Sequence, residues 1–336
     1  MNIKTDIVIG LSYGDEAKAK CTHHLLKKKT LFGRNKYDYC MRFNGSCNAG
    51  HTIYHNGKKI ITHSIPIGVV NGIKSIIGRG CVLNPNKFFE EIEYLENNGI
   101  NCRDLIKIDY ATHIITPEHI AEDSKDVKIG TTKMGNGQAY RDKYARIGVR
   151  AESIKELQPF LIDIYQELYS ENNKEILCEG AQAFGLDIDW SFDYPYCTSS
   201  HCTVGGAILN GIPYNSIRNV YGIAKAFDTY VGERDFQPNG KIYEQLQIVG
   251  KELGATTGRK RKCNFVNVNL IKKAIDINCV NILIVNKMDV LQEVGVWNVI
   301  YNNEIVELGS EKNFKKFLNE YFKGVKIKYS YSPNEI

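Results

Sequence analysis

Short apolar runs alternate with amphipathic stretches along most of the chain. Residues 5–9 form the first apolar run and end at Gly10, which predicts a buried strand followed by a turn. Further strands are predicted at residues 39–43, 59–63 (half of a hairpin after the Asn56-Gly57 turn), 175–178, 220–226 and 280–285, and residues 76–78 followed by 82–83 have the pattern of a strand and then a loop. Helices are predicted at residues 17–26, 87–98, 152–169 and 270–277, with 152–169 the longest.

This alternation of strands and helices indicates a mostly parallel sheet with helices packed on it. The sequence contains no repeat, no low-complexity stretch and no Pro/Ser-rich linker. We therefore expect an α/β fold in a single domain over residues 1–336, with a long, mostly parallel central sheet flanked by helices. Ligands of such sheets bind beyond the carboxyl ends of the strands, so the loops at those ends are where chemistry is expected.

Composition narrows the class of protein. The hydrophobic content of 43% and charged content of 24% are those of a globular enzyme. The net charge of +5 suits anionic metabolites but is too small and too scattered to indicate nucleic acid. Because no apolar run approaches roughly 18 residues and the first residues have no signal-peptide core, we expect a cytoplasmic protein without a membrane partner. The ten cysteines include no C-x-x-C pair, and no glutamate follows His51 as a zinc H-E-x-x-H site requires, so reduced thiols without zinc are expected.

The loop after the first strand, residues 10–20, has the layout of a phosphate cradle. A strand runs into a glycine turn, and Lys18 stands where a helix begins. Asp15 occupies a position where the usual P-loop pattern requires glycine. A carboxylate would repel phosphate unless it holds Mg²⁺ or removes a proton. An ordinary strand-to-helix turn with a solvated Asp-Glu pair is the alternative interpretation.

Two further glycine-containing segments could also contact a ligand. Residues 44–52 would place the imidazole of His51 against a ligand, where it could act as an acid, although a lone histidine is more often structural. Residues 130–150 combine glycines, threonines and cations without an apolar period that would bury a helix or strand. Glycine allows backbone N–H groups to approach an anion and arginine grips phosphate, so this segment is either an anion-binding loop or a basic surface loop.

Three segments in the second half suit ligand recognition. Residues 254–262 join glycine and threonine to four consecutive cations, which favours a loop for a dicarboxylate; a nucleic-acid or nuclear-localisation patch is the alternative. Residues 286–289 (NKMD) follow a buried strand and resemble the guanine-reading element of GTPases, where the carboxylate accepts hydrogen bonds that adenine cannot supply. Residues 179–182 and 194–200 offer amides and hydroxyls suited to a base and a phosphate, or are plain loops.

In order, these segments resemble adenylosuccinate synthetases over nearly the whole chain. The collinear motifs are residues 14–20 (GDEAKAK), 48–52 (NAGHT), 129–150, 179–182 (EGAQ), 194–200 (YPYCTSS), 254–261 (GATTGRKR) and 286–291 (NKMDVL). The chain is shorter than most bacterial members and is similar to the compact archaeal and phage forms. The resemblance implies a homodimeric α/β ligase with a P-loop-like GTP site.

The implied reaction joins IMP and L-aspartate, with GTP and Mg²⁺, to give adenylosuccinate, GDP and phosphate. Asp15 would remove the N1 proton of the purine, the 6-oxygen would attack the γ-phosphate with assistance from His51, and the aspartate amine would displace the resulting 6-phosphoryl group. Gln182 would complete the catalytic set, and Asp15 with the Gly50 carbonyl would coordinate Mg²⁺. GTP is expected at Gly14, Glu16, Lys18, Lys20, Lys287, Asp289, Ser330 and Ser332. The nucleoside monophosphate and aspartate are expected at Asn48, Thr131, Thr132, Arg146 (reaching into the partner's site), Gln182, Thr198, Val231, Thr256, Thr257, Arg259 and Arg261.

The chain also departs from the family pattern. Ala17 and Ala19 replace two glycines of the phosphate loop, Gln138 replaces a proline, Asn267 replaces an aspartate, and residues 226–235 (AFDTYVGERD) depart from the usual A-Y-S-T-R-V-G-A-G-P. Two alternatives therefore stay open. One is the phage-type synthetase that joins aspartate to dGMP, forming 2-amino-deoxyadenylosuccinate with ATP; Asp15 and the NKMD segment favour IMP and GTP instead. The other is a GTP-binding regulatory module without catalysis.

Overall fold

A parallel nine-stranded sheet forms the centre of the molecule in the computed structural model, which describes residues 3–127, 129–170, 173–254 and 258–336. In spatial order its strands are β17 (Lys326–Tyr329), β14 (Ile282–Asn286), β11 (Ile217–Lys225), β1 (Ile3–Gly10), β10 (Lys174–Glu179), β2 (Tyr39–Arg42), β5 (Lys74–Ile77), β7 (Ile106–Asp109) and β9 (Leu161–Ile162). Every neighbouring pair is parallel. The predicted α/β class with a long parallel sheet is confirmed.

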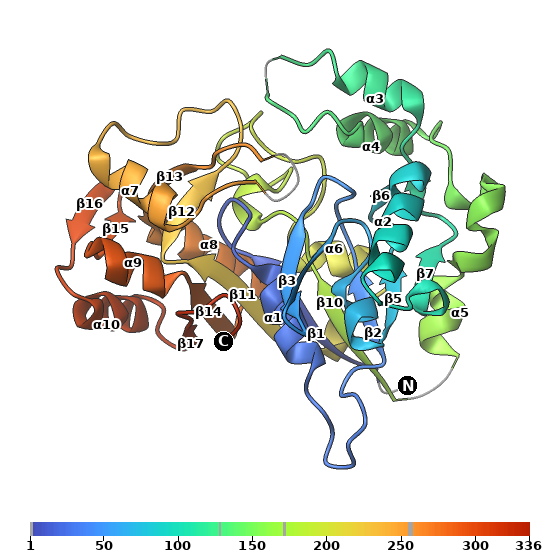
Figure 1. Ribbon diagram of the computed structural model, residues 1–336, viewed down its shortest axis with the longest axis horizontal. Helices are drawn as coiled ribbons and strands as arrows, with labels where there is room; N and C mark the ends of the chain where they lie inside the picture. Colours follow the sequence, from blue (N-terminus) through green and yellow to red (C-terminus); the bar gives the residue numbers. More distant parts are fainter. Residues whose placement is uncertain (1–2, 128, 171–172, 255–257) are drawn as a thin grey trace.

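Smaller sheets and ten helices surround this sheet in the described part of the chain (Figure 1). The smaller strands are β12 (Phe227–Tyr230), β13 (Lys262–Asn267), β15 (Asn298–Tyr301) and β16 (Glu304–Glu307) in one sheet, the hairpin β3 (His51–His55) and β4 (Lys58–Thr62), and the pair β6 (Val82–Leu83) and β8 (His113–Ile114). The helices are α1 (Lys18–Leu26), α2 (Pro85–Asn97), α3 (Pro117–Asp123), α4 (Asn136–Ala145), α5 (Ile164–Tyr169), α6 (Val204–Leu209), α7 (Lys241–Val249), α8 (Val268–Asn278), α9 (Met288–Val294) and α10 (Glu311–Tyr321). None of the described helices is both long and apolar enough to cross a membrane.

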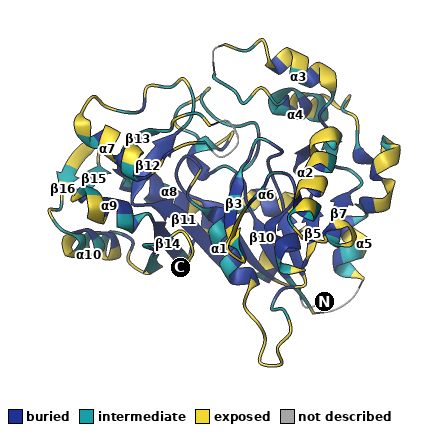
Figure 2. Cartoon of the chain, viewed as in Figure 1, coloured by how far each residue is buried: buried dark blue, intermediate teal, exposed yellow. Residues whose placement is uncertain are grey.

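Most residues of the central strands are buried, as Figure 2 shows by its dark strands. Along β1, Ile7 and Ile9 belong to one hydrophobic cluster and Val8 to a second cluster. Successive side chains of a strand point to opposite faces, so each face of the sheet has its own core. A strand buried on both sides reads as a continuous apolar run, which is why β1 was recognisable from sequence.

The predicted long helix at residues 152–169 is wrong. The structure has two 3₁₀ turns, Ala151–Ser153 and Lys155–Phe160, then β9, and only then the short helix α5. Pro159 lies inside the second turn, and proline both lacks an N–H donor and disfavours helical backbone in the residue before it. The Asp163 side chain, which accepts from the Tyr165 amide, then starts α5.

Residues 130–150 also differ from expectation, because they contain the helix α4. This helix buries only Ala139 and Tyr140, so its apolar face is too narrow to be visible as a period. Gly135 precedes it with a φ of 77°, and the Gly135 amide donates to Asp123 of α3 at 2.8 Å. The helix is therefore anchored to its neighbour α3 rather than to the sheet.

Candidate active site

The carboxyl ends of five adjacent strands gather functional residues at one edge of the sheet. Strands β14, β11, β10 and β2 end in Asn286, Lys225, Glu179 and Arg42, all buried, and β1 ends in Gly10. Buried polar groups at this edge are costly unless each has a partner. Their partners, described below, come from the loops that the sequence singled out.

The phosphate loop is shaped by its own carboxylate. Buried Glu16 accepts hydrogen bonds from the backbone amides of Gly14 (2.8 Å) and Ser12 (3.2 Å) and pairs with Lys18 at 2.7 Å. A Cβ on Gly10 would lie 2.6 Å from the Glu16 carboxylate, so only glycine fits at the end of β1. The predicted layout of strand, glycine turn and lysine at a helix start is therefore present, with Glu16 inside the loop.

The loop backbone adopts left-handed conformations at two closely spaced non-glycine positions. Asp15 has a φ of 58° and Ala17, which caps α1, a φ of 71°. Such backbone costs an L-residue about 1 kcal/mol or more. Ala19, in contrast, is an ordinary buried residue within α1. The two alanines that replace family glycines are thus physically different: one is strained and the other is not.

Asp15 lies next to the predicted aspartate-binding loop. Its carboxylate forms an ion pair with the Arg261 guanidinium at 2.8 Å and is about one third exposed. Arg261 also pairs with buried Glu252 at 2.7 Å. The predicted proton acceptor and a predicted binder of a substrate carboxylate are thus brought into contact from opposite ends of the chain.

His51 stands in a buried charged cluster that sequence analysis missed in part. Its Nδ1 contacts the Glu179 carboxylate, which also accepts from Arg42 at 3.0 Å and from the Ile67 amide at 2.9 Å. Burial, reinforced by Arg42, lowers the pKa of His51 to about 4. Burial by itself would raise the pKa of Glu179, but Arg42 and His51 outweigh it and lower that pKa to about 2. The pair is therefore a neutral imidazole that donates from Nδ1 to a carboxylate, leaving Nε2 for a ligand.

The amide groups predicted to recognise the nucleoside monophosphate lie together. Gln182, with a φ of 53°, donates from Nε2 to Asn48 at 3.4 Å and accepts from Ser200 at 3.5 Å. Asn44, which was not predicted, forms two hydrogen bonds with the Ala181 backbone at 2.8 and 3.0 Å. Asn44 thereby fixes the strand end next to Gln182.

The aspartate loop touches the 130–132 segment. The Arg259 guanidinium donates to the carbonyls of Gly130 and Thr131, each at 3.4 Å. The other expected substrate positions are half-buried at Thr132, Thr198 and Val231 and exposed at Arg146, and Gly50, expected to offer its carbonyl to Mg²⁺, is half-buried. Thr256 and Thr257 lie outside the described residues.

The guanine-reading segment and the carboxyl-terminal tail form a joint site. The Met288 amide donates to the Ser330 carbonyl at 3.2 Å, next to half-buried Asp289. Lys20 does not face the phosphate loop: its ammonium donates to the Ser330 hydroxyl at 2.7 Å and to the Ser332 carbonyl at 3.0 Å, and burial lowers its pKa to about 8. Lys20 therefore positions the tail.

The departures at residues 228 and 267 are structurally linked. Ser12 of the phosphate loop donates to the buried carboxylate of Asp228, and the Asn267 amide donates to the same carboxylate at 2.8 Å. The Asn267 side chain meanwhile caps α8 by accepting from Leu270. The carboxylate at position 228 thus connects the phosphate loop to the strand that follows the aspartate loop.

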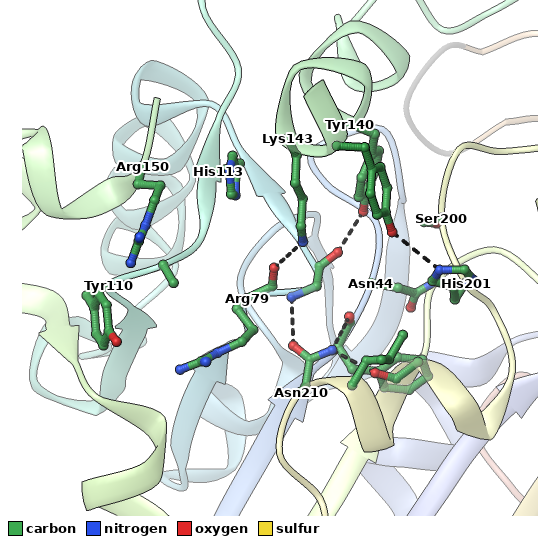
Figure 3. Close-up of a pocket in the computed structure, with 16 residues that line it drawn as sticks. Asn44, Arg79, Tyr110, His113, Tyr140, Lys143, Arg150, Ser200, His201 and Asn210 are labelled. Atoms are coloured by element: carbon green, nitrogen blue, oxygen red, sulfur yellow. Dashed lines mark hydrogen bonds between the residues drawn. The ribbon is translucent and has the colours of Figure 1, made fainter. Parts of the chain in front are cut away.

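A cavity of about 520 Å³ lies beside the Gln182 group rather than within it (Figure 3). It shares Asn44 and Ser200 with that group, and Lys143 of α4 reaches across it to the Arg79 carbonyl at 2.6 Å. Its remaining lining comes from Phe43, Gly80, Tyr110, Ala111, His113, Tyr140, Tyr144, Arg150, His201, Gly206, Leu209 and Asn210. The cavity therefore opens on the α4 side of the site.

Comparison with known proteins agrees with this arrangement. A family model described as adenylosuccinate synthetase matches residues 7–161 and 151–331. The chain is 37% identical to an adenylosuccinate synthetase of Bacteroides fragilis over 341 residues, covering 86% of this chain and 78% of that protein, and 34% identical to one of Lodderomyces elongisporus (86% and 79%).

Solved structures agree as well. Fully ligated adenylosuccinate synthetase of Plasmodium falciparum superposes with a TM-score of 0.85 at 26% identity, covering 98% of this chain and 97% of that chain. The succinoaminodeoxyadenylate synthetase of cyanophage S-2L, bound to dGMP and dATP, shares the fold with a TM-score of 0.77 at 19% identity (99% and 94%). From the motifs, the site and these matches, the chain belongs to the adenylosuccinate synthetase family of ligases.

Proposed function

We propose that this chain, acting as one domain over residues 1–336, joins L-aspartate to IMP with GTP, giving adenylosuccinate, GDP and phosphate. The main support is the position of Asp15, which lies at the rim of the phosphate loop and is paired with Arg261. A carboxylate placed there can remove the N1 proton of a purine whose 6-oxygen then attacks the γ-phosphate. Arg261 can receive a carboxylate of the incoming aspartate.

In this proposal His51 donates a hydrogen bond or a proton to the phosphoryl group during its transfer to the 6-oxygen. The imidazole is neutral at neutral pH because burial and Arg42 lower its pKa. Triphosphate oxygens beside Nε2 would favour the charged form and raise the pKa, while Glu179 holds the ring through Nδ1. His51 would thus become an acid only after the nucleotide is bound.

Mg²⁺ fits the exposed side of Asp15. The Asp15 carboxylate already attracts the positive guanidinium of Arg261, and a carboxylate oxygen with the Gly50 carbonyl offers the hard ligands that Mg²⁺ prefers. When bound, the ion would neutralise charge on the transferring phosphates. Lys18 and the surrounding loop backbone would hold those phosphates.

We further propose GTP as the phosphoryl donor and a homodimer as the active form. The NKMD segment at the end of β14 supports guanine recognition, with Lys287 and Asp289 next to the tail. Tyr144 and Ile147, close to Arg146 in the chain, are 65% and 72% exposed, and Leu209, which lines the cavity together with Tyr144, is 64% exposed. Apolar side chains clustered around a cation suit an interface with a second copy.

The phage-type reaction with dGMP and ATP is the second candidate. It is favoured by the altered 226–235 segment, in which Asp228 contacts the phosphate loop. A phosphate-release assay with IMP, dGMP and GMP, each with GTP and with ATP, separates the two candidates. Aspartate-dependent phosphate release only with IMP and GTP supports the proposal, release only with dGMP and ATP supports the phage-type reaction, and nucleotide binding without release in any combination indicates a regulatory module.

The dimer has its own test. Light scattering should report two copies, and mixing Arg146→Ala with Asp15→Asn should restore part of the activity that each variant lacks alone. This recovery is expected because a mixed dimer has one site with an intact Asp15 and a partner's intact Arg146. A monomer that turns over normally would contradict the shared site.

A further inference from the structure

Glu252 is a fully buried carboxylate on which three cations converge. Its oxygens lie 2.7 Å from the Arg261 guanidinium, 3.4 Å from the Lys225 ammonium and 3.9 Å from the Lys287 ammonium. Burial by itself would raise the pKa of Glu252, but the three cations outweigh it and hold that pKa below its ordinary value, so Glu252 carries its charge at neutral pH. None of the family motifs quoted above includes Glu252.

These cations come from different parts of the site. Arg261 belongs to the aspartate loop and pairs with Asp15, Lys287 belongs to the guanine-reading segment, and Lys225 ends β11. The described residues on either side of the aspartate loop pair with each other: the Arg261 amide donates to the Glu252 carbonyl at 3.0 Å, and Leu253 pairs with Lys260. Glu252 and Arg261 are thus neighbours through the backbone as well as through their side chains.

The Lys287 ammonium contacts other groups of the protein. It donates to the Gly250 carbonyl at 2.7 Å and lies beside Glu252. A nucleotide that draws Lys287 away would leave Glu252 with one fewer cation. Glu252 would then hold Arg261 more strongly, and Arg261 would be less available to Asp15, because the same guanidinium serves both carboxylates.

We propose that Glu252 is a positioning residue that couples guanine binding at Lys287 to the placement of Arg261 between the aspartate loop and Asp15. This inference rests on the proposed function, because it assigns guanine and aspartate to the two ends of the network. Lys287 pairs with Glu252, Glu252 pairs with Arg261, and Arg261 pairs with Asp15. These three ion pairs connect the two ends without a gap. Binding at either end therefore changes affinity at the other by the same factor.

The coupling can be measured by calorimetric titration of GDP with and without L-aspartate. We expect the affinity of the wild type for GDP to change at least fivefold when aspartate is added, and this change to disappear in Glu252→Gln. Asp6→Asn is the matched control, because Asp6 is also a buried carboxylate paired with two cations, Arg218 and Lys36, but contacts none of the site loops. This control should keep the fivefold change.

A double-mutant cycle tests the same coupling through the KM for aspartate and kcat. Lys287→Met should raise the KM for aspartate about tenfold in the wild-type background, with a smaller effect on kcat, and should have no further effect in Glu252→Gln. Lys287 is about one third exposed, so its variant also tests the coupling if Glu252→Gln does not fold. A loss of stability alone would not produce this KM-selective, non-additive pattern.

Two results would overturn the inference: equal GDP affinity with and without aspartate in the wild type, or an unchanged KM for aspartate in Lys287→Met. If the fivefold coupling is present but no nucleotide combination releases phosphate, the proposed reaction is wrong and the role of Glu252 stands.

Discussion

Replacement of Glu179 by glutamine tests whether the buried cluster around His51 acts in catalysis or only in stability. The two Glu179 oxygens accept from different donors: one from Arg42 and His51, and the other from the Ile67 amide. A glutamine keeps the shape but must turn its NH₂ toward one of these donors. The variant therefore loses a charge and also places two donors face to face.

The magnitude follows from the lowered pKa of Glu179. A pKa of about 2, compared with an ordinary value near 4.5, corresponds to roughly 3 kcal/mol of folding free energy at neutral pH. Because the folded-state pKa is the lower one, this stabilisation is complete above about pH 4.5 and is lost as the pH falls toward 2. Breaking a buried ion pair typically costs about 3–5 kcal/mol, which agrees with this value.

Activity should fall independently of stability. Without the carboxylate charge, the imidazole loses the group that stabilises its charged form at Nδ1, and only the phosphate oxygens still favour that form. We expect kcat to fall roughly 100-fold, which is at the low end of what general acid–base groups contribute. The assay is phosphate release at saturating substrate concentrations, below the unfolding temperature, together with urea unfolding at pH 7 and pH 4.

Asp6→Asn again provides the control. Burial would raise the pKa of Asp6, but hydrogen bonds from Arg218 and Tyr37 outweigh burial and lower this pKa to about 2 as well. The variant should lose a comparable free energy of unfolding and keep its kcat. If Glu179→Gln loses the expected stability but retains kcat within about threefold, the proposed role of the His51–Glu179 pair is refuted.

Other variants address other parts of the site. Asp15→Asn should abolish turnover while nucleotide binding measured by calorimetry stays within a few-fold; near-normal turnover would contradict its role as proton acceptor. Asp289→Asn should reduce the GTP-to-ATP ratio of kcat/KM at least tenfold, and an unchanged ratio would remove the guanine-reading proposal. Ala17→Gly should stabilise the protein by about 1 kcal/mol in urea unfolding because Ala17 has left-handed backbone, whereas Ala19→Gly should destabilise it by about 1 kcal/mol because Ala19 is within α1. Equal signs for the two alanine variants would contradict the difference in backbone conformation.

The sequence was sufficient where local pattern decides structure. The buried strand β1, the glycine turn and the helix α1 follow one another directly, so strand, turn and lysine were all predicted. A carboxylate inside a phosphate loop is chemically unusual, so the residue types alone marked Asp15 as a candidate for catalysis. The helix predicted at 152–169 failed because Pro159 and the cap at Asp163 outweighed an apolar pattern that spans four separate elements.

Partners distant in the chain could not be predicted. Glu179 is 128 residues from His51, and Arg261, which contacts both Asp15 and Glu252, is far from Asp15 in the chain. Glu179 was visible as the first residue of a recognised segment, but its burial against Arg42 was not. Such residues become recognisable only once the strand order is known.

The position of β1 in the sheet has a consequence for biosynthesis. The first strand to leave the ribosome is central, and its two neighbours are β10 and β11, which are made more than 160 residues later. At typical translation rates this delay lasts roughly 10 to 40 s, during which an apolar strand with two unpaired edges is exposed. Folding dominated by such distant pairings is slow, so we expect the nascent chain to need a chaperone and its yield to improve when synthesis is slowed by cooling.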